Sequence, residues 1–330
     1  MTPDAALDEI IKEIKKGLTG EEEKDIAFLK ECAEKYIDTE YGEDIADACA
    51  KMIYNRLPDD LKEEFSEMAR RERLGIAECN DRAKALLLGK KPKEARVILE
   101  EMIDRLEKSG RYKASDGIEY FDFRQPMEEA LFREAYGMDK KIRIVPEPVS
   151  GLYRLYAESL YEMGEYEKSM ESSNKALLWN PYKASAALEY AHCLRALGRM
   201  DEYKKYVDDI FKIAWIPEKL AGAFRCLAYY YADREEWEAA AVCDDLGRYY
   251  NPESDIARKE RLYIDEHLPE GWSTPDGDRL KDLAKQYGFP LDPDEYLVRL
   301  AHSAGEAFKN AGSTEMAEYF FGVEKDLKRN

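Results

Sequence analysis

Positive charge is what this sequence lacks most. Of its 330 residues, 51 are Lys or Arg and 70 are Asp or Glu, which gives a formal net charge of −19. A protein that binds nucleic acid needs a basic footprint for the phosphates, and no concentrated basic patch interrupts the acidic background. An anionic membrane surface would repel the chain for the same reason. We therefore expect neither nucleic acid nor membrane among its partners.

Long apolar runs are also missing. No segment approaches the roughly 18 consecutive apolar residues that indicate a membrane-spanning helix. The first residues, MTPDAALDEIIKEIKKG, have no basic leading region and interleave apolar with charged residues, which is unlike a signal peptide. These features together predict a cytoplasmic protein.

The motifs of catalysis and of metal or cofactor binding are absent. The three histidines, His192, His267 and His302, lie far apart in the sequence, and no HExxH, GxSxG or phosphate-binding loop occurs. Adjacent acidic residues such as Asp208 and Asp209 point to different sides of a helix, so they make poor metal or acid–base pairs. We expect a protein that is not an enzyme and that holds no cofactor and no metal.

Paired cysteine motifs are missing as well. None of the six cysteines forms a CxxC pair, and most sit in apolar helical patterns, so we expect buried, reduced thiols. A thiol-based sensor or enzyme is the alternative, because Cys193, Cys226 and Cys243 fall in the central part of the chain. His192 precedes Cys193, but on a helix it points about 100° away.

What the sequence does contain is helical periodicity. Apolar residues recur at helical spacing, broken by short Gly or Pro punctuation, and only 119–123 and 141–145 are candidate strands. The composition, 45% hydrophobic and 37% charged, suits an elongated helical protein with much exposed surface. The sequence therefore predicts an all-α fold.

An internal repeat runs through the centre of the chain. Gly164 and Gly198 lie 34 residues apart, and Asn180-Pro181 recurs as Asn251-Pro252, 71 residues later. A period of 34 residues with two helices in each unit resembles the tetratricopeptide repeat (TPR). The resemblance implies an α-solenoid, a right-handed superhelix of helical hairpins, because a single unit cannot bury its apolar face alone.

The repeat pattern places small residues where the two helices of a unit approach each other. In units starting at Ser150 and Ala184, Ala157 and Ala191 occupy position 8, and Gly305 does so in a unit starting at Val298. Ser169 is still small at position 20, but Tyr203 fills position 20 of the Ala184 unit, where a bulky side chain should disturb local packing.

The same frame divides the whole chain. We predict an irregular helical region over 1–75, with helices over 4–16, 20–37 and 43–56 and a long helix from Pro58 toward Gly89. The remaining segments are a TPR-like unit (76–109), a degenerate unit or insertion (110–149), three TPR units (150–252), a degenerate unit with an insert (253–297), and a C-terminal TPR-like unit (298–330). More loosely, residues 76–252 resemble uncharacterised bacterial TPR proteins in which a segment like FRQPMEEALF precedes a linker like IVPEPVS.

In TPR arrays the first helices of successive units line a concave groove. By resemblance, the groove positions of this chain include Ala232, Asp233 and the residues we select as the candidate partner site: Arg154, Glu158, Tyr161, Leu188, His192, Arg195, Arg225 and Tyr229. Twenty such positions carry five cationic and four acidic residues, so the groove is depleted of the negative charge that dominates the chain. The resemblance implies a non-enzymatic scaffold that binds a protein or peptide partner.

Two interpretations of the groove arginines remain open. Arg154, Arg195 and Arg225 could hold carboxylates of a peptide, since the guanidinium fork binds carboxylate bidentately, or they could only neutralise local acids such as Glu158. In either case Glu158 would repel a terminal carboxylate, which argues against a chaperone C-terminus as the ligand.

Self-assembly is a further alternative. Phe320 and Phe321 are adjacent and cannot share one helix face, so one of them could be exposed or buried in a homodimer. The groove could also be filled by the chain itself. In either case the protein would be a structural scaffold.

The segment FDFRQPMEEALFREAYG, residues 121–137, occupies the slot of a missing unit. Pro126 followed by two glutamates predicts a helix that runs to Tyr136 and ends at Gly137. We expect Tyr120, Phe121 and Phe123 to be buried, as in a degenerate repeat or plug. A ligand-contacting loop is the alternative, and the sequence does not say whether the segment packs beside the groove or inside it.

Overall fold

The computed structural model describes residues 3–36, 42–58, 61–62, 75–110, 112, 118–137, 139–253 and 255–328. They form sixteen α-helices and two short strands, which confirms the all-α expectation. The chain divides into two compact units, 1–75 and 76–330, and each is described by itself. Within the described segments, no helix combines the length and the apolar character needed to cross a membrane.

Three helices make the N-terminal unit: α1 (Pro3–Lys16), α2 (Glu22–Tyr36) and α3 (Gly42–Tyr54). They match the three helices expected there and enclose a small apolar core around Leu29 and Ile45. Asp25 is buried and links the loop before α2 to the residues after α3. Its carboxylate accepts hydrogen bonds from Thr19 N–H at 2.7 Å and from Arg56 Nε at 3.2 Å. The predicted helix from Pro58 toward Gly89 lies largely outside the described residues, which resume at residue 75 with α5.

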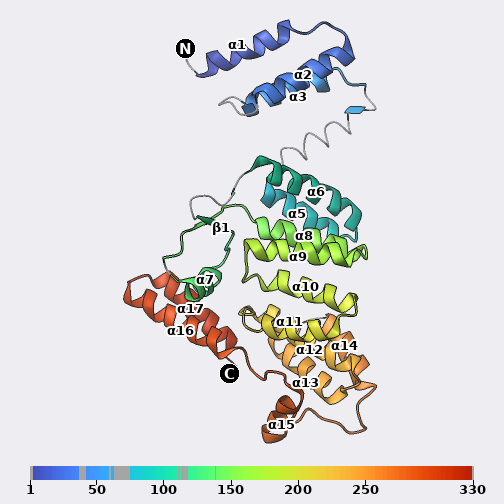
Figure 1. Ribbon diagram of the computed structural model, residues 1–330, viewed down its shortest axis with the longest axis vertical. Coiled ribbons are helices and arrows are strands. Elements are labelled where there is room, and N and C mark those ends of the chain that lie inside the picture. The colour runs from blue at the N-terminus through green and yellow to red at the C-terminus, as the bar shows by residue number, and fades with distance from the viewer. Residues whose placement is uncertain are drawn as a thin grey trace. The chain divides into compact units, whose positions relative to one another are not determined.

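Helical hairpins stack one on the next in the second unit (Figure 1). The pairs are α5 (Ile76–Leu88) with α6 (Pro92–Ser109), α8 (Val149–Glu162) with α9 (Tyr166–Trp179), α10 (Ala184–Ala196) with α11 (Met200–Ile210), and α12 (Pro217–Asp233) with α13 (Trp237–Tyr250). Helix α14 (Asp255–Asp265) packs on α13, and α15 (Gly277–Tyr287) follows it. The first helices α8, α10 and α12 also contact one another, so the expected solenoid is present.

Small residues mark the close approaches within the hairpins. Ala157 and Ala191 have no exposed surface, and Ser169 Oγ donates a hydrogen bond of 2.7 Å to Ala157 O across the α8–α9 pair. Tyr203, where packing trouble was expected, is fully buried and its hydroxyl donates to Cys226 O at 2.9 Å. The array therefore accommodates the bulky residue because its polar end reaches a backbone acceptor on the next hairpin.

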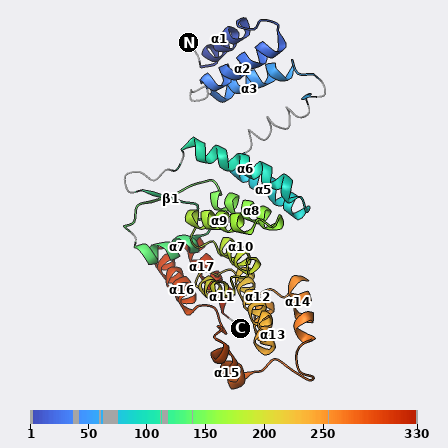
Figure 2. The ribbon, with the colours of Figure 1, turned by 45° about the vertical axis from the view of Figure 1, so that its right-hand side comes forward.

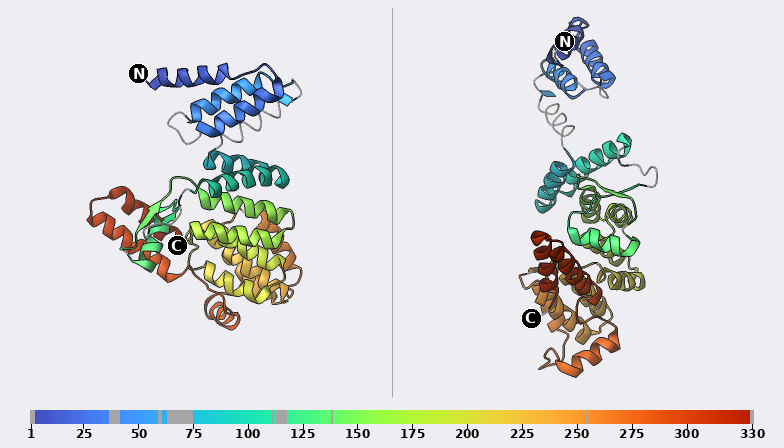
Figure 3. Two further views of the ribbon diagram at one scale, coloured as in Figure 1. Left: turned by 45° about the horizontal axis from the view of Figure 1, so that its top comes forward. Right: turned by 90° about the vertical axis from the view of Figure 1, so that its left-hand side faces the viewer.

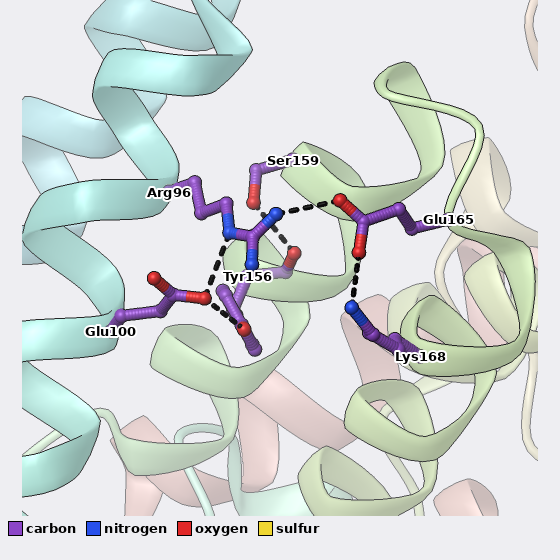
Figure 4. A network of polar contacts seen from close by, with 6 residues as sticks. All are labelled: Arg96, Glu100, Tyr156, Ser159, Glu165 and Lys168. Atoms are coloured by element: carbon purple, nitrogen blue, oxygen red, sulfur yellow. Dashed lines mark hydrogen bonds and ion pairs between the residues drawn. The ribbon is translucent and has the colours of Figure 1, made fainter.

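A polar network ties α6 to the next hairpin (Figure 4). Arg96 pairs with Glu100 at 2.8 Å on its own helix and with Glu165 at 2.6 Å at the start of α9. Tyr156 of α8 donates to Glu100 at 2.6 Å, and Lys168 pairs with Glu165 at 2.6 Å. The branched contacts fix the relative position of two units, which a single exposed ion pair would do only weakly.

The segment 119–145 leaves the array as a small subdomain. Strands β1 (Glu119–Phe121) and β2 (Ile142–Ile144) pair in parallel and flank α7 (Pro126–Tyr136). The sequence predicted both strands and the helix but not the pairing of the strands. Phe121 and Phe123 are only 8% and 7% exposed, and both contact the ring of Phe132, so their predicted burial is confirmed. Tyr120 is only partly buried, because its neighbours on the short strand leave one side open to solvent. Gly137 ends α7 by donating its N–H to Arg133 O at 2.8 Å.

Helix α7 lies beside the C-terminal hairpin, α16 (Glu295–Asn310) and α17 (Thr314–Leu327), in every view (Figures 2 and 3). Met127 N–H donates to Tyr319 Oη at 3.4 Å, and the Tyr319 ring meets Trp215 of the α11–α12 connection at 6.4 Å. Asp122 N–H donates to Trp179 O at 3.1 Å, at the end of α9. The subdomain and the C-terminal hairpin thus pack on the edge of the array formed by the inter-unit connections.

Phe320 and Phe321 pack in different directions within the C-terminal hairpin. Phe320 is buried in the apolar core, and the Phe321 ring covers Gly305 of α16. A Cβ added at Gly305 would lie 2.6 Å from Phe321 Cε1, which explains why this position of the repeat holds the smallest residue.

The Gly305 contact predicts opposite effects for two glycine substitutions. Gly305→Ala should lower the free energy of unfolding by about 1–2 kcal/mol, because the new methyl group must displace a packed ring. Gly322→Ala in α17 should raise it by about 0.5–1 kcal/mol, since nothing lies within 4 Å of the added Cβ and alanine favours helix. Urea denaturation followed by circular dichroism measures both, and a stabilised Gly305→Ala would contradict the close packing.

Buried Asp122 predicts a second effect, on the pH dependence of stability. Its carboxylate accepts from Ser150 N–H at 2.7 Å at the start of α8, and burial raises the pKa of Asp122 from 3.8 to about 6, partly offset by that hydrogen bond and by Lys183. Protonated Asp122 therefore stabilises the folded chain at a pH below the pKa that Asp122 has in the unfolded chain. This stabilisation is lost as the pH rises through the pKa that Asp122 has in the folded chain.

Asp122→Asn removes the buried charge and keeps an oxygen acceptor for Ser150. We expect its advantage in unfolding free energy over the parent protein to grow between about pH 4 and pH 6 and then level off. Urea midpoints of both proteins across this range measure it, with exposed Asp282→Asn as the control. Parallel curves would show that Asp122 ionises normally.

Candidate functional site

A pocket of about 530 Å³ opens between the first helices of three successive units. Helix α12 contributes Tyr229 and two alanines, α10 contributes Arg195, and α14 closes the far side. The lining residues are Arg195, Ala228, Tyr229, Ala232, Asp233, Lys259, Glu260, Tyr263 and Ile264. The pocket is bounded by α10, α12 and α14, and the lining includes no residue of the 119–145 subdomain or of the C-terminal hairpin.

The 34-residue frame explains which side chains reach this pocket. Arg195, Tyr229, Ala232 and Asp233 all fall on groove positions assigned from the sequence. Lys259 and Tyr263 were missed, although the signal was present. Extending the frame by one period from Ala221 starts a unit at residue 255 and places 259 and 263 at its positions 5 and 9.

Arg195 is held by two tyrosines from neighbouring helices. Its guanidinium carbon lies 4.5 Å from the centroid of the Tyr229 ring, and Nη2 donates to Tyr161 Oη at 3.4 Å. The first contact is a cation–π interaction, which orients the planar group. Three predicted residues from α8, α10 and α12 therefore meet at one place.

The charged residues that line the pocket form no ion pairs. Over the described ranges, Arg195, Asp233, Lys259 and Glu260 have no oppositely charged partner within the 4.0 Å that defines a salt bridge. Elsewhere on the array, charged side chains pair along and between helices, as Arg96 and Lys204 do. The pocket thus keeps charges of both signs that no residue in the described part of the chain pairs with directly.

His192 lies next to this group, on the same face of α10. Its Nδ1 is 3.9 Å from Glu189 Oε2, and its ring is 6.3 Å from that of Tyr161. Burial alone would lower the pKa of His192, but hydrogen bonding to Cys226 and Glu189 outweighs it and raises the pKa to about 10. Glu189 and Cys226 therefore favour the protonated imidazole and also offset its charge, so His192 adds no unpaired cation beside Arg195.

The pairing of His192 with Cys226 could not be predicted from sequence neighbours. The adjacent Cys193 instead donates a hydrogen bond to Ser169 Oγ at 3.2 Å, in the α8–α9 hairpin. Cys226 belongs to the next unit and is only 4% exposed. All six cysteines are buried and free, as expected for reduced thiols.

The other candidate residues take different roles. Arg154 pairs with Glu158 at 2.9 Å and lies 3.8 Å from Glu189, so acids of the array already neutralise its guanidinium. Leu188 is buried against Gly222, where an added Cβ would come within 2.9 Å of Leu188 Cδ1. These residues pack the first helices together and do not line the pocket.

Arg225 contributes to the same electrostatic environment as Arg195. Burial raises the pKa of Glu260, and the charges of Arg225, Arg195 and His192 partly offset the rise. Arg225 and His192 therefore influence Glu260 without belonging to the lining of the pocket. Within the described part of the chain, no cluster of three or more His, Cys, Asp or Glu side chains could hold a metal ion.

Comparison with solved structures finds helical repeat proteins of similar fold. No protein-family model and no curated protein matches the chain. One similar solved structure is the C-terminal part of a TPR repeat-containing protein from Cytophaga hutchinsonii, with 17% identity and a TM-score of 0.29 over 78% of this chain and 98% of that one. Another is Rap protein complexed with competence and sporulation factor, with 16% identity and a TM-score of 0.32 over 98% of each chain. The TPR-like fold of this chain follows from its own stacked hairpins.

Proposed function

We propose that this TPR-like array is a non-enzymatic scaffold that binds a peptide segment of a partner protein through the groove formed by α8, α10, α12 and α14. The observation that carries the proposal is the pocket of about 530 Å³ in that groove, with side chains of both charges that form no ion pair within the described residues. Its volume lies within the range of about 300–1,000 Å³ that is usual for ligand sites.

The walls of the pocket suit protein recognition. Tyr229 and Tyr263 are 40% and 55% exposed, which is high for aromatic side chains in a hollow of the surface. Tyrosine and arginine dominate the residues that carry binding energy at protein interfaces, because they combine apolar area with hydrogen bonding. Arg195 and Tyr229 are already arranged in contact, so little side-chain entropy is lost when a partner binds.

A binding role fits the site better than catalysis does. Cys226 with His192 is the arrangement that most resembles a nucleophile with its base, and Cys226 is too buried for a substrate to reach. The net charge of −19 favours a protein partner over nucleic acid or an anionic membrane, and a cytoplasmic setting suits the reduced thiols.

The groove proposal predicts that replacing Tyr229 weakens peptide binding, whereas replacing Tyr249 does not. Peptides enriched from a random displayed library on the immobilised chain should bind Tyr229→Ala on the order of tenfold more weakly, because the variant loses both apolar contact and the support of Arg195. Exposed Tyr249→Ala on α13, outside the pocket lining, should bind like the parent protein. Fluorescence anisotropy with labelled peptides measures the dissociation constants.

Two results would refute the groove as the binding surface. One is that no peptide is enriched over the blank support. The other is that the enriched peptides bind Tyr229→Ala as tightly as the parent protein while the variant keeps its helical circular dichroism.

A further inference from the structure

The charged residues that line the pocket balance one another in sign, although the chain as a whole carries a net charge of −19. The cations of the lining are Arg195 and Lys259, and the acids are Asp233 and Glu260. Lys259 and Asp233 are exposed to solvent, so Arg195 and Glu260 are the less exposed charges of the pocket. Neither of these two forms an ion pair within the described residues.

Most N–H groups of Arg195 donate no hydrogen bond within the described residues. A guanidinium carries five N–H groups, and over the described ranges Arg195 uses one of them, toward Tyr161 at 3.4 Å. Stacking on Tyr229 fixes the plane of the group, so its free edge has a defined direction. A carboxylate is the group that this planar fork binds bidentately.

We propose that the pocket receives an aspartate or glutamate side chain of the bound segment, which pairs with Arg195 while a neighbouring apolar side chain lies on Tyr229 and Tyr263, and that Glu260 competes with it from within the chain. This inference rests on the proposed function and specifies its ligand. Glu260 acts as a competitor because it is the carboxylate that already shares the field of Arg195 and Arg225.

A cationic side chain fits the pocket less well. It would be repelled by the guanidinium of Arg195, which forms no ion pair within the described residues. A phosphorylated side chain is also an anion, and the phosphoserine form of the peptide in the test below distinguishes it from a carboxylate.

Competition with Glu260 couples binding to pH. An incoming carboxylate repels the carboxylate of Glu260, whose pKa burial already raises, so binding favours the protonated form of Glu260 and tightens as the pH falls toward that pKa. The charged and titratable groups around Glu260 are His192 and Arg195 on α10, Arg225, Tyr229 and Asp233 on α12, and Lys259 and Tyr263 on α14.

The test uses one peptide from the library selection in three synthetic forms. The parent form carries Asp or Glu, the second carries the corresponding amide, and the third carries phosphoserine at that position. The proteins are the full chain, Arg195→Gln and Glu260→Gln, with exposed Arg143→Gln and Asp282→Asn as charge-matched controls outside the pocket lining. Anisotropy titrations between about pH 5 and pH 7 give the dissociation constants.

We expect the acidic peptide to bind the full chain on the order of tenfold more tightly than its amide form, and Arg195→Gln to lose most of this preference. Glu260→Gln should bind the acidic peptide several-fold more tightly at about pH 7, with no further gain on acidification. The two control variants should match the parent protein in affinity and in pH dependence.

Several outcomes would overturn the inference while leaving the proposed function intact. They are enriched peptides without acidic residues, equal affinity for the acidic and amide forms, tighter binding of the phosphoserine form, or Glu260→Gln behaving like the parent protein at every pH. In each case the peptides would still lose affinity for Tyr229→Ala. Peptides insensitive to Tyr229→Ala would instead refute the groove itself.

Discussion

The close approach of two helices over small residues is the constraint on which the rest of the array depends. Ala157 and Ala191 are fully buried where the helices of their hairpins meet, and Gly305 leaves room for the ring of Phe321. A hairpin closed in this way still has apolar faces that it cannot cover itself. Each unit must therefore pack on the next, and its first helix becomes part of one shared surface.

That shared surface explains how residues distant in sequence form one site. Arg195, Tyr229 and Tyr263 come from three units, yet all line one pocket because the units repeat at a fixed interval. The charged residues of the pocket form no ion pairs within the described segments, whereas the contact between α6 and α9 is closed by the paired charges of Arg96 and Glu165. The array thus combines paired charges that hold units together with a pocket whose charged side chains are not paired.

The 119–145 subdomain and the C-terminal hairpin strengthen one edge of the array. Asp122 binds the first turn of α8, Phe121 and Phe123 pack against Phe132 of α7, and Tyr319 joins α7 to Trp215. Neither element contributes to the lining of the pocket. The segment that interrupts the repeat therefore packs on the edge of the solenoid and leaves the pocket accessible.

The sequence by itself determined the helical hairpins, the burial of Phe121 and Phe123, and the groove positions of Arg195 and Tyr229. These follow from helical spacing and from a 34-residue period, both of which are local properties of the chain. Only the tertiary structure decided that His192 meets Cys226, that α14 closes the pocket with Glu260, and that α16 packs beside α7. Such contacts depend on the angles between successive units and on where the chain returns after an irregular segment, which no periodic pattern encodes.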